Sequence, residues 1–238
     1  MKAVLMAAGM GTRVSKEIKS IPKCTVRVGE KTLIEHTISQ LRRKEVKEIA
    51  VVVGYQANRL CDLLKGEGLH IYHNPFFDMT NSIASLWFAR EFLHGDDFLL
   101  LNADLYMEER VLDEILADEA SPVLFSDGTR RKEADYKLSY RDGVLQKHGK
   151  ELDGDEVTGE YLGIAKICRP FLPLFKERME QLINRQQHHL WWENVLYSFI
   201  GERDVYVEEI PPGLFWAEVD TLRDYERILE YANKLAKV

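Results

Sequence analysis

Apolar runs typical of strands alternate with amphipathic runs typical of helices along the first 130 residues. KAVLMAA, EIAVVVG, LHIYHN, DFLLLNADLYM and SPVLFSD predict strands, the fourth of them a single strand buried on both faces. Between the first two, KTLIEHTISQLRR places Ile34, Ile38 and Leu41 at helical spacing, and Thr32 and Glu35 fit a capping box at its start. This alternation predicts an α/β fold with a mostly parallel, twisted sheet and helices on both faces.

The pattern changes after residue 130. DYKLSYRDGVLQKHGKEL alternates polar and apolar residues around Asp142-Gly143, which predicts an antiparallel hairpin. GEYLGIAKI, DVYVEEI and LFWAEVD predict strands, whereas RPFLPLFKERMEQLI, HLWWENVLYSFI and TLRDYERILEYANKLA predict helices. Because no linker or internal repeat interrupts the chain, a single domain over residues 1–238 with an antiparallel insertion is expected.

Charge and cysteine content exclude several classes of protein. The 32 basic and 39 acidic residues give a net charge of −7, which argues against nucleic-acid binding. Cys24, Cys61 and Cys168 lie far apart, which favours neither a disulfide framework nor a zinc site. No apolar run suggests membrane insertion, and the N-terminus has a strand pattern rather than that of a signal peptide. A cytoplasmic protein, monomeric or a small homo-oligomer, is expected.

The first strand runs directly into the loop AAGMGTR. Its small residues allow backbone N–H groups to close around phosphate oxygens, and Arg13 adds a permanently charged fork. Lys23, in IPKC, adds a point charge nearby. A tight strand-to-helix turn with a surface lysine is the alternative, but the combination of these features favours a phosphate site. The loop residues concerned are Ala7, Ala8, Gly9, Met10, Gly11, Thr12 and Arg13.

Two aspartates follow apolar runs, where a parallel sheet presents its ligand edge. Asp104 ends LLLNAD and Asp220 ends FWAEVD. A carboxylate there is costly unless it is paired or binds a metal, and Mg²⁺ prefers a few carboxylates together with substrate phosphates. The alternatives are that Asp104 caps the helix after it and that Asp220 belongs to the start of the last helix. Glu218 alternates onto the same strand face as Asp220 and Trp216.

The opening strand, the AAGMGTR loop and the PK dipeptide together resemble the signature of the sugar-phosphate-type nucleotidyltransferases. This resemblance implies a Rossmann-like fold in which residues 1–130 mainly bind nucleotide, residues 131–238 mainly bind the acceptor, and the hairpin covers the acceptor. It also implies that Asp104 and Asp220 bind Mg²⁺ and that Lys23 neutralises phosphate charge. The catalytic set it implies is Arg13, Lys23, Asp104 and Asp220.

The segments NPFFDMTNSIASLWFAR and HLWWENV resemble the bacterial choline-phosphate and aminoethylphosphonate cytidylyltransferase branch of that family. Matching positions are Asn74, Asn81, Ser85, Leu86 and residues 190–194. The branch implies CTP as the donor, with Tyr55, Asn81 and Ser82 near the nucleotide. The acceptor-binding residues it suggests are Asn102, Tyr161, His189, Trp192, Glu193, Trp216 and Glu218. An aromatic-rich helix also fits a simple core position, so Trp192 has that alternative.

The resemblance implies an enzyme that transfers CMP from CTP to phosphocholine, 2-aminoethylphosphonate or a similar acceptor and releases pyrophosphate. His189 stands where choline-type members carry an aspartate, which leaves room for an aminophosphonate or a polyol phosphate. The alternative within enzymes is a sugar-1-phosphate or polyol-phosphate nucleotidyltransferase that uses CTP, UTP or dTTP. A catalytically silent relative that only binds nucleotide is the alternative outside enzymes.

Overall fold

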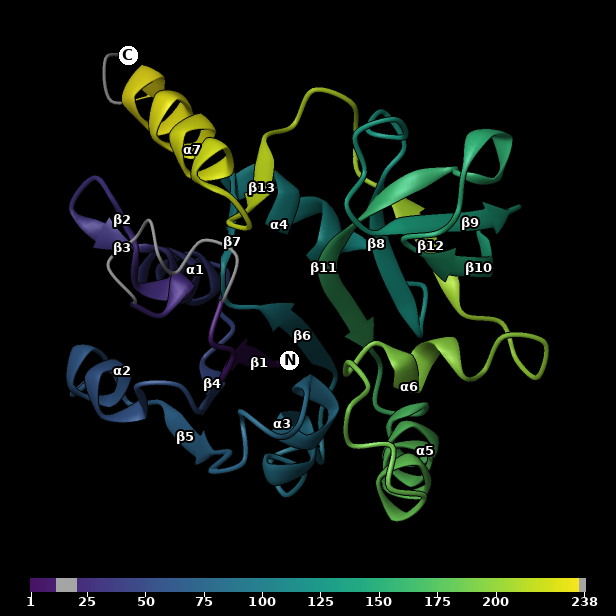
Figure 1. Cartoon of the computed structure of the whole chain (residues 1–238), viewed down its shortest axis with the longest axis horizontal. Helices are drawn as coiled ribbons and strands as arrows, with labels where there is room; N and C mark the ends of the chain where they lie inside the picture. Colours follow the sequence, from purple (N-terminus) through teal and green to yellow (C-terminus); the bar gives the residue numbers. More distant parts are fainter. Residues whose placement is uncertain (12–20, 236–238) are drawn as a thin grey trace.

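The computed structural model describes residues 1–11 and 21–235, and it centres on one nine-stranded sheet. The strands are β1 (Lys2–Ala7), β4 (Glu48–Val53), β5 (His70–His73), β6 (Phe98–Asn102), β8 (Val123–Asp127), β9 (Lys137–Arg141), β10 (Val144–Gly149), β11 (Gly159–Ile167) and β12 (Tyr206–Glu209). Their order is β5-β4-β1-β6-β11-β8-β12-β10-β9 (Figure 1). The predicted α/β architecture is confirmed.

The two halves of the sheet differ in their pairing. β5, β4, β1 and β6 are parallel neighbours, whereas β11 pairs antiparallel with both β6 and β8. β12 is parallel to β8, the hairpin β9–β10 follows it in the order, and β9 also pairs antiparallel with β11. The turn residues of the hairpin, Asp142 and Gly143, have φ of 52° and 71°, the left-handed conformation that a tight hairpin turn requires. The predicted hairpin is therefore confirmed.

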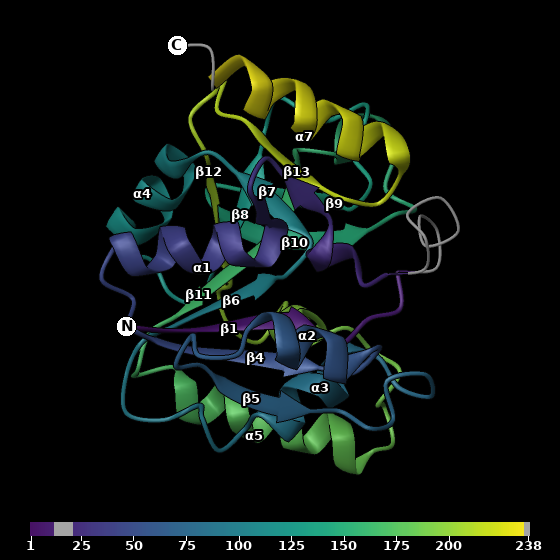
Figure 2. The ribbon, with the colours of Figure 1, turned by 90° about the vertical axis from the view of Figure 1, so that its left-hand side faces the viewer.

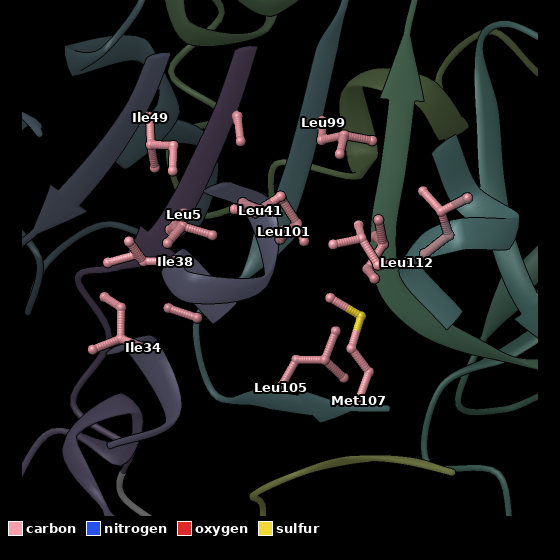
Figure 3. Close-up of a cluster of buried hydrophobic side chains, with 14 of the residues drawn as sticks. Leu5, Ile34, Ile38, Leu41, Ile49, Leu99, Leu101, Leu105, Met107 and Leu112 are labelled. Atoms are coloured by element: carbon pink, nitrogen blue, oxygen red, sulfur yellow. The ribbon is translucent and has the colours of Figure 1, made fainter. Parts of the chain in front are cut away.

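The helices cover both faces of the sheet. They are α1 (Leu33–Arg43), α2 (Ala57–Leu63), α3 (Ser82–Phe88), α4 (Glu109–Ala117), α5 (Leu172–Asn184), α6 (Asn194–Tyr197) and α7 (Leu222–Leu235). Figure 2 shows α1 and α4 on one side of β1, and α3 and α5 on the other. Successive side chains of β1 point to opposite faces of the sheet. Leu5 packs in the hydrophobic cluster under α1 and α4, and Val4 packs in the cluster on the side of α3 and α5. Figure 3 shows the first of these clusters.

The expected capping box at the start of α1 is present. Thr32 Oγ1 accepts from the backbone N–H of Glu35, and Glu35 Oε2 accepts from that of Thr32. Leu5, Ile34, Ile38 and Leu41 then meet in the core, as the helical spacing predicts (Figure 3). Among the described residues, no helix has the length and apolar character needed to cross a bilayer.

The single strand expected over DFLLLNADLYM is wrong. The chain leaves the sheet at Ala103 and Asp104, and a second strand, β7 (Leu105–Met107), pairs antiparallel with β13 (Trp216–Glu218) outside the main sheet. Continuing β6 would bury the Asp104 carboxylate inside the sheet at a high desolvation cost. The break instead brings Asp104 beside the end of β13. A further small pair joins β2 (Arg27–Val28) and β3 (Lys31–Thr32).

The helix expected over HLWWENVLYSFI forms only at its centre, in α6. The carbonyls of His188 and Leu190 accept from the backbone N–H groups of Asn81 and Ile83 at the start of α3. Those carbonyls are therefore unavailable for a helix at residues 188–190, so this segment remains irregular. The segment is thereby fixed against the N-terminal end of α3.

Candidate active site

The loop after β1 emerges between β4 and β6, at the carboxyl edge of the parallel strands. Ala7 and Ala8 are buried, and Gly9 and Met10 are exposed. Among the described residues, no atom beyond the chain neighbours of Gly9 lies within 4 Å of the position that a Cβ there would take, so this part of the structure leaves its backbone open to a ligand. The other predicted loop ligands, Thr12 and Arg13, lie outside the described residues.

Gly11 is the point at which this loop approaches Lys23. Its φ is +59°, and a Cβ there would lie 2.6 Å from Lys23 Cγ. Any other residue would therefore be strained and would push against the lysine side chain. Lys23 begins a short 3₁₀ helix (Lys23–Thr25) directly after Pro22, so the absence of a side chain at Gly11 lets the lysine extend past the loop.

Lys23, Asp104 and Asp220 meet, although the sequence separates them by up to 197 residues. Lys23 Nζ donates to Asp220 Oδ1 at 2.5 Å and lies 3.5 Å from Asp104 Oδ2. Burial acts to lower the pKa of Lys23, but the two carboxylates outweigh it and raise that pKa. The ammonium is therefore held charged between two carboxylates.

The structure decides against the helix-cap alternatives for both aspartates. Glu108, not Asp104, is the residue that precedes α4. Thr221 and Asp224 exchange the hydrogen bonds that begin α7, at 2.8–3.3 Å, and Asp220 lies one residue before them. Asp104 and Asp220 thus both lie in the site. The antiparallel pairing of β7 with β13 brings them there, with the backbone N–H of Val219 donating to the carbonyl of Asp104 at 3.0 Å.

Asn102 and Glu218 lie beside these aspartates. Asn102 Nδ2 donates to Glu218 Oε1 at 3.4 Å, and Asn102 Oδ1 accepts from the indole N–H of Trp192 at 3.1 Å. Burial, with the charges of Asp104 and Asp220, raises the pKa of Glu218 well above its ordinary value, against the opposing charge of Lys23. Glu218 therefore adds a further carboxyl group to this wall.

Trp192 does not line a cavity, contrary to its predicted role in binding the acceptor. It is completely buried in the core cluster under α5, and its indole fixes Asn102. Its neighbour Trp191 is 41% exposed and faces the site instead. Trp191, and not Trp192, therefore faces the site because residues 188–190 do not form the expected helix.

Two cavities meet at this cluster. The first, of about 220 Å³, follows the loop after β1 and the start of α3 and is lined by Met6, Ala8, Gly9, Phe77, Thr80, Asn81, Ser82, Ser85, Asn102, Asp104, Trp191 and Glu218. The second, of about 230 Å³, is lined by Ser82, Asn102, Arg130, Glu133, Asp135, Tyr136, Lys150, Glu160, Tyr161, Trp191, Glu193, Tyr197, Trp216, Glu218, Asp220 and Asp224. The first contains predicted nucleotide residues and the second contains predicted acceptor residues. Ser82, Asn102, Trp191 and Glu218 belong to both.

Tyr55 and His189 are among the predicted residues that line neither cavity. The backbone of Tyr55 donates to the carbonyl of Ala8, but its side chain does not line the first cavity. His189 lines a neighbouring hollow of about 320 Å³ that shares Trp191 and Lys150 with the second cavity. Asn74 is one of the positions that match the cytidylyltransferase branch. It is completely buried, and its amide donates hydrogen bonds to Ser85 and Thr80, so it fixes the loop instead of facing a ligand.

Several residues of the second cavity were not predicted. Arg130 Nε lies 2.8 Å from Glu160 Oε2, and its guanidinium stacks 4.5 Å over the ring of Trp216. Tyr136 and Tyr197 also line this cavity. Arg130 lies in a polar run without periodicity, and Tyr136 precedes β9, so neither carries a local signal.

Residues 3–190 match the model of the MobA-like NTP transferase domain. The chain belongs to this family. The predicted resemblance to nucleotidyltransferases is thereby confirmed. The chain is 27% identical over 238 residues to a choline-phosphate cytidylyltransferase from Streptococcus pneumoniae, with 97% of each chain covered. It is 26% identical over 254 residues to a CTP:phosphoglutamine cytidylyltransferase from Campylobacter jejuni, with 97% of this chain and 100% of the other covered.

The fold of this family member also matches a solved structure along almost its whole length. A CTP:phosphocholine cytidylyltransferase from Streptococcus pneumoniae superimposes with a TM-score of 0.78 at 25% identity, covering 97% of this chain and 98% of that one. The match extends beyond residue 190 and includes β13 and α7. The family match and this structural match together cover both cavities.

Proposed function

We propose that this chain is a Mg²⁺-dependent cytidylyltransferase that transfers CMP from CTP to a small acceptor carrying a phosphate or phosphonate and a cationic group. The observation that carries this proposal is the meeting of two cavities at Asp104 and Asp220, both of which form ion pairs with Lys23. One cavity follows the glycine loop and the other is rich in carboxylates and aromatic rings. The relatives, both named as cytidylyltransferases, support CTP as the donor.

The residues at the junction fit a magnesium ion. Asp104 and Asp220 converge on one cation in this structure, the ammonium of Lys23. The described residues contain no cluster of three or more His, Cys, Asp or Glu side chains arranged for a metal. Two carboxylates with triphosphate oxygens are a common ligand set for Mg²⁺, so Asp104 and Asp220 would hold it. Bound Mg²⁺ supplies positive charge that stabilises the transferring phosphoryl group.

The reaction needs positioning and charge neutralisation more than proton transfer. An acceptor oxygen attacks the α-phosphorus of CTP; the new P–O bond forms as the bond to the β-phosphate oxygen breaks, and pyrophosphate leaves with the electron pair. Because a phosphate or phosphonate oxygen is already anionic, no general base is required. Lys23 contributes positive charge at the junction, and Asn102, held by Trp192, keeps the wall between the cavities in place.

The charge of the second cavity favours a cationic acceptor. Its acidic lining residues are Glu133, Asp135, Glu160, Glu193, Glu218, Asp220 and Asp224, and its basic ones are Arg130 and Lys150. Both basic residues are already paired, Arg130 with Glu160 and Lys150 with Asp135. This excess of acidic over basic groups would attract a positively charged group on the acceptor more strongly than a neutral sugar ring.

Pyrophosphate release tests the proposal directly. CTP, UTP, dTTP, ATP and GTP are each combined with Mg²⁺ and with phosphocholine, phosphoethanolamine, 2-aminoethylphosphonate, inositol 1-phosphate or glucose 1-phosphate. We expect release with CTP and the amine-containing acceptors. Activity confined to UTP or dTTP with glucose 1-phosphate would overturn the proposal and favour the sugar-1-phosphate alternative.

Glu193 gives the acceptor step an expected pH dependence. Burial raises the pKa of Glu193 to about 8, with the charge of Asp104 adding to the rise and the backbone N–H and Asn102 opposing it. The carboxyl group is therefore protonated near pH 7 and must lose its proton to pair with a cation. Affinity for a cationic acceptor is expected to rise by up to about tenfold per pH unit up to pH 8 and then to level off.

The measurement compares acceptor KM between pH 6 and 9.5 in the wild type and in Glu193→Gln. The ratio of the acceptor KM values of wild type and variant removes the effect of the acceptor's own titration. A ratio that does not change with pH would contradict the role of Glu193 in binding the cation. The raised pKa of Glu193 also predicts how the stability of the free protein depends on pH. Since the folded pKa lies above the ordinary value of 4.5, the free protein loses stability as the pH rises from about 4.5 to 8. Glu193→Gln is expected to reduce that loss.

A further inference from the structure

The second cavity contains buried hydroxyl groups that lack partners. Tyr161 is 6% exposed, and its hydroxyl makes no hydrogen bond to any described residue. The buried hydroxyl of Tyr197 lies close to that of Tyr136 but likewise makes no hydrogen bond of good geometry to the described part of the chain. An unpaired buried polar group destabilises the folded protein. Because both tyrosines line the cavity, a ligand there would be able to supply the missing partners.

Glu193 is a third polar group of this wall. It is 7% exposed, lines the same cavity, and forms no ion pair with any described residue. Glu160 and Asp135 differ from it, because Arg130 and Lys150 pair with them. Burial raises the pKa of the Tyr161 and Tyr197 hydroxyls, and Glu193 lies close enough to both for its charge to add to the rise. The three groups therefore form one polar cluster with hydrogen-bonding capacity to spare.

Most of the aromatic ring faces in the cavity are already in contact with other side chains. The guanidinium of Arg130 covers the ring of Trp216, and His148 stacks on Tyr197 with ring centroids 3.8 Å apart. Tyr136 lies parallel to Tyr197, within 11°, and Trp191 meets Tyr136 edge-on. A quaternary ammonium has no N–H groups and depends on open ring faces. This wall offers few such faces but several oxygen atoms.

We infer that the acceptor's cationic group bears N–H bonds, as a primary ammonium does, and that Tyr161, Tyr197 and Glu193 select it over a quaternary ammonium. This inference rests on the proposed cytidylyl transfer and narrows its acceptor. A primary ammonium donates up to three hydrogen bonds, which matches the three oxygen-bearing side chains. A trimethylammonium group would bury the same side chains without donating a hydrogen bond to any of them.

A methylation series tests this selection. Phosphoethanolamine, its N-methyl and N,N-dimethyl derivatives and phosphocholine carry three, two, one and no N–H donors on the same phosphate ester. With CTP and Mg²⁺, kcat/KM is expected to fall along the series, by roughly 100-fold from the first member to the last. The pair of 2-aminoethylphosphonate and its N,N,N-trimethyl derivative is expected to show the same order.

Tyr161→Phe separates recognition from a structural effect. It removes the hydroxyl group and keeps the ring, so kcat/KM for phosphoethanolamine is expected to fall about tenfold while that for phosphocholine stays the same. A purely structural role would lower both equally. The Tm should not fall, because no hydrogen bond to a described residue is lost. Tyr72→Phe, on β5 and outside the cavities, is the matched control and is expected to leave both rates unchanged.

The outcomes distinguish this inference from the proposed function. A flat series, or a preference for phosphocholine, would overturn the inference while cytidylyl transfer stands. Turnover of sugar or inositol phosphates alone would overturn both the proposal of a cationic acceptor and this inference. If the series gives no turnover, the Tm of the wild type is measured with CTP, Mg²⁺ and each acceptor. A rise with phosphoethanolamine that is lost in Tyr161→Phe supports the inference, and no difference between the amines overturns it.

Discussion

Asp104→Asn is expected to lower kcat for CTP-dependent pyrophosphate release by roughly 1,000-fold. The substitution keeps the shape of the side chain but removes one of the two charges proposed to hold Mg²⁺. Asp220 would remain paired with Lys23, whose ammonium lies 2.5 Å from it, so the loop after β1 should retain its position. The expected defect is therefore one of charge at the reacting phosphate and not of folding.

The measurement is single-turnover pyrophosphate release over a range of Mg²⁺ concentrations, with Asp113→Asn as the control. Asp113 lies on α4, pairs with Lys44 at 2.5 Å and is not among the residues that line either cavity. The control should keep wild-type rates. A loss of less than tenfold in Asp104→Asn, with unchanged Mg²⁺ dependence, would remove Asp104 from the metal site.

Lys23→Met is expected to lower kcat by at least about 100-fold, because a cation at the junction of the cavities is lost. It also leaves Asp104 and Asp220 facing one another without their shared counterion. In EDTA, the variant should be destabilised by roughly 2 kcal/mol relative to the wild type. Because Mg²⁺ can take the place of the ammonium, adding it should raise the Tm of Lys23→Met more than that of the wild type.

The Mg²⁺-dependent rise in Tm can be measured without turnover. Lys65→Met, an exposed lysine after α2, is the matched control and should show neither the loss of activity nor the Mg²⁺-dependent rise in Tm. If Mg²⁺ leaves the Tm of Lys23→Met unchanged in the absence of nucleotide, the two carboxylates do not form the metal site by themselves. An unchanged kcat would contradict the role of Lys23 at the phosphates.

Local signals in the sequence were enough for much of the fold. The capping box of Thr32 and Glu35 and the Asp142-Gly143 turn depend on a few adjacent residues, so both were predictable and are confirmed. Asp104 and Asp220 were recognisable because each ends an apolar run, where a carboxylate is costly without a partner. That the two approach the same lysine depends on the β7–β13 pairing, which no local pattern indicates.

The acceptor side was less predictable because its wall is built from distant segments. The orientation of Trp191 and Trp192 depends on hydrogen bonds from the start of α3 to the carbonyls of His188 and Leu190, which prevent the expected helix. Arg130 acquires its place only through contacts with Glu160 and Trp216. These are tertiary effects, and they override the helical pattern of the isolated segment.

The late position of β13 in the chain has a consequence for synthesis. Asp220 and Glu218 are translated after the whole nine-stranded sheet, and they also follow residue 190, where the family match ends. A nascent chain that has folded its sheet therefore still lacks one of the two aspartates beside Lys23. A product interrupted before residue 220 would lack Asp220, so the magnesium site proposed at Asp104 and Asp220 would be incomplete in it.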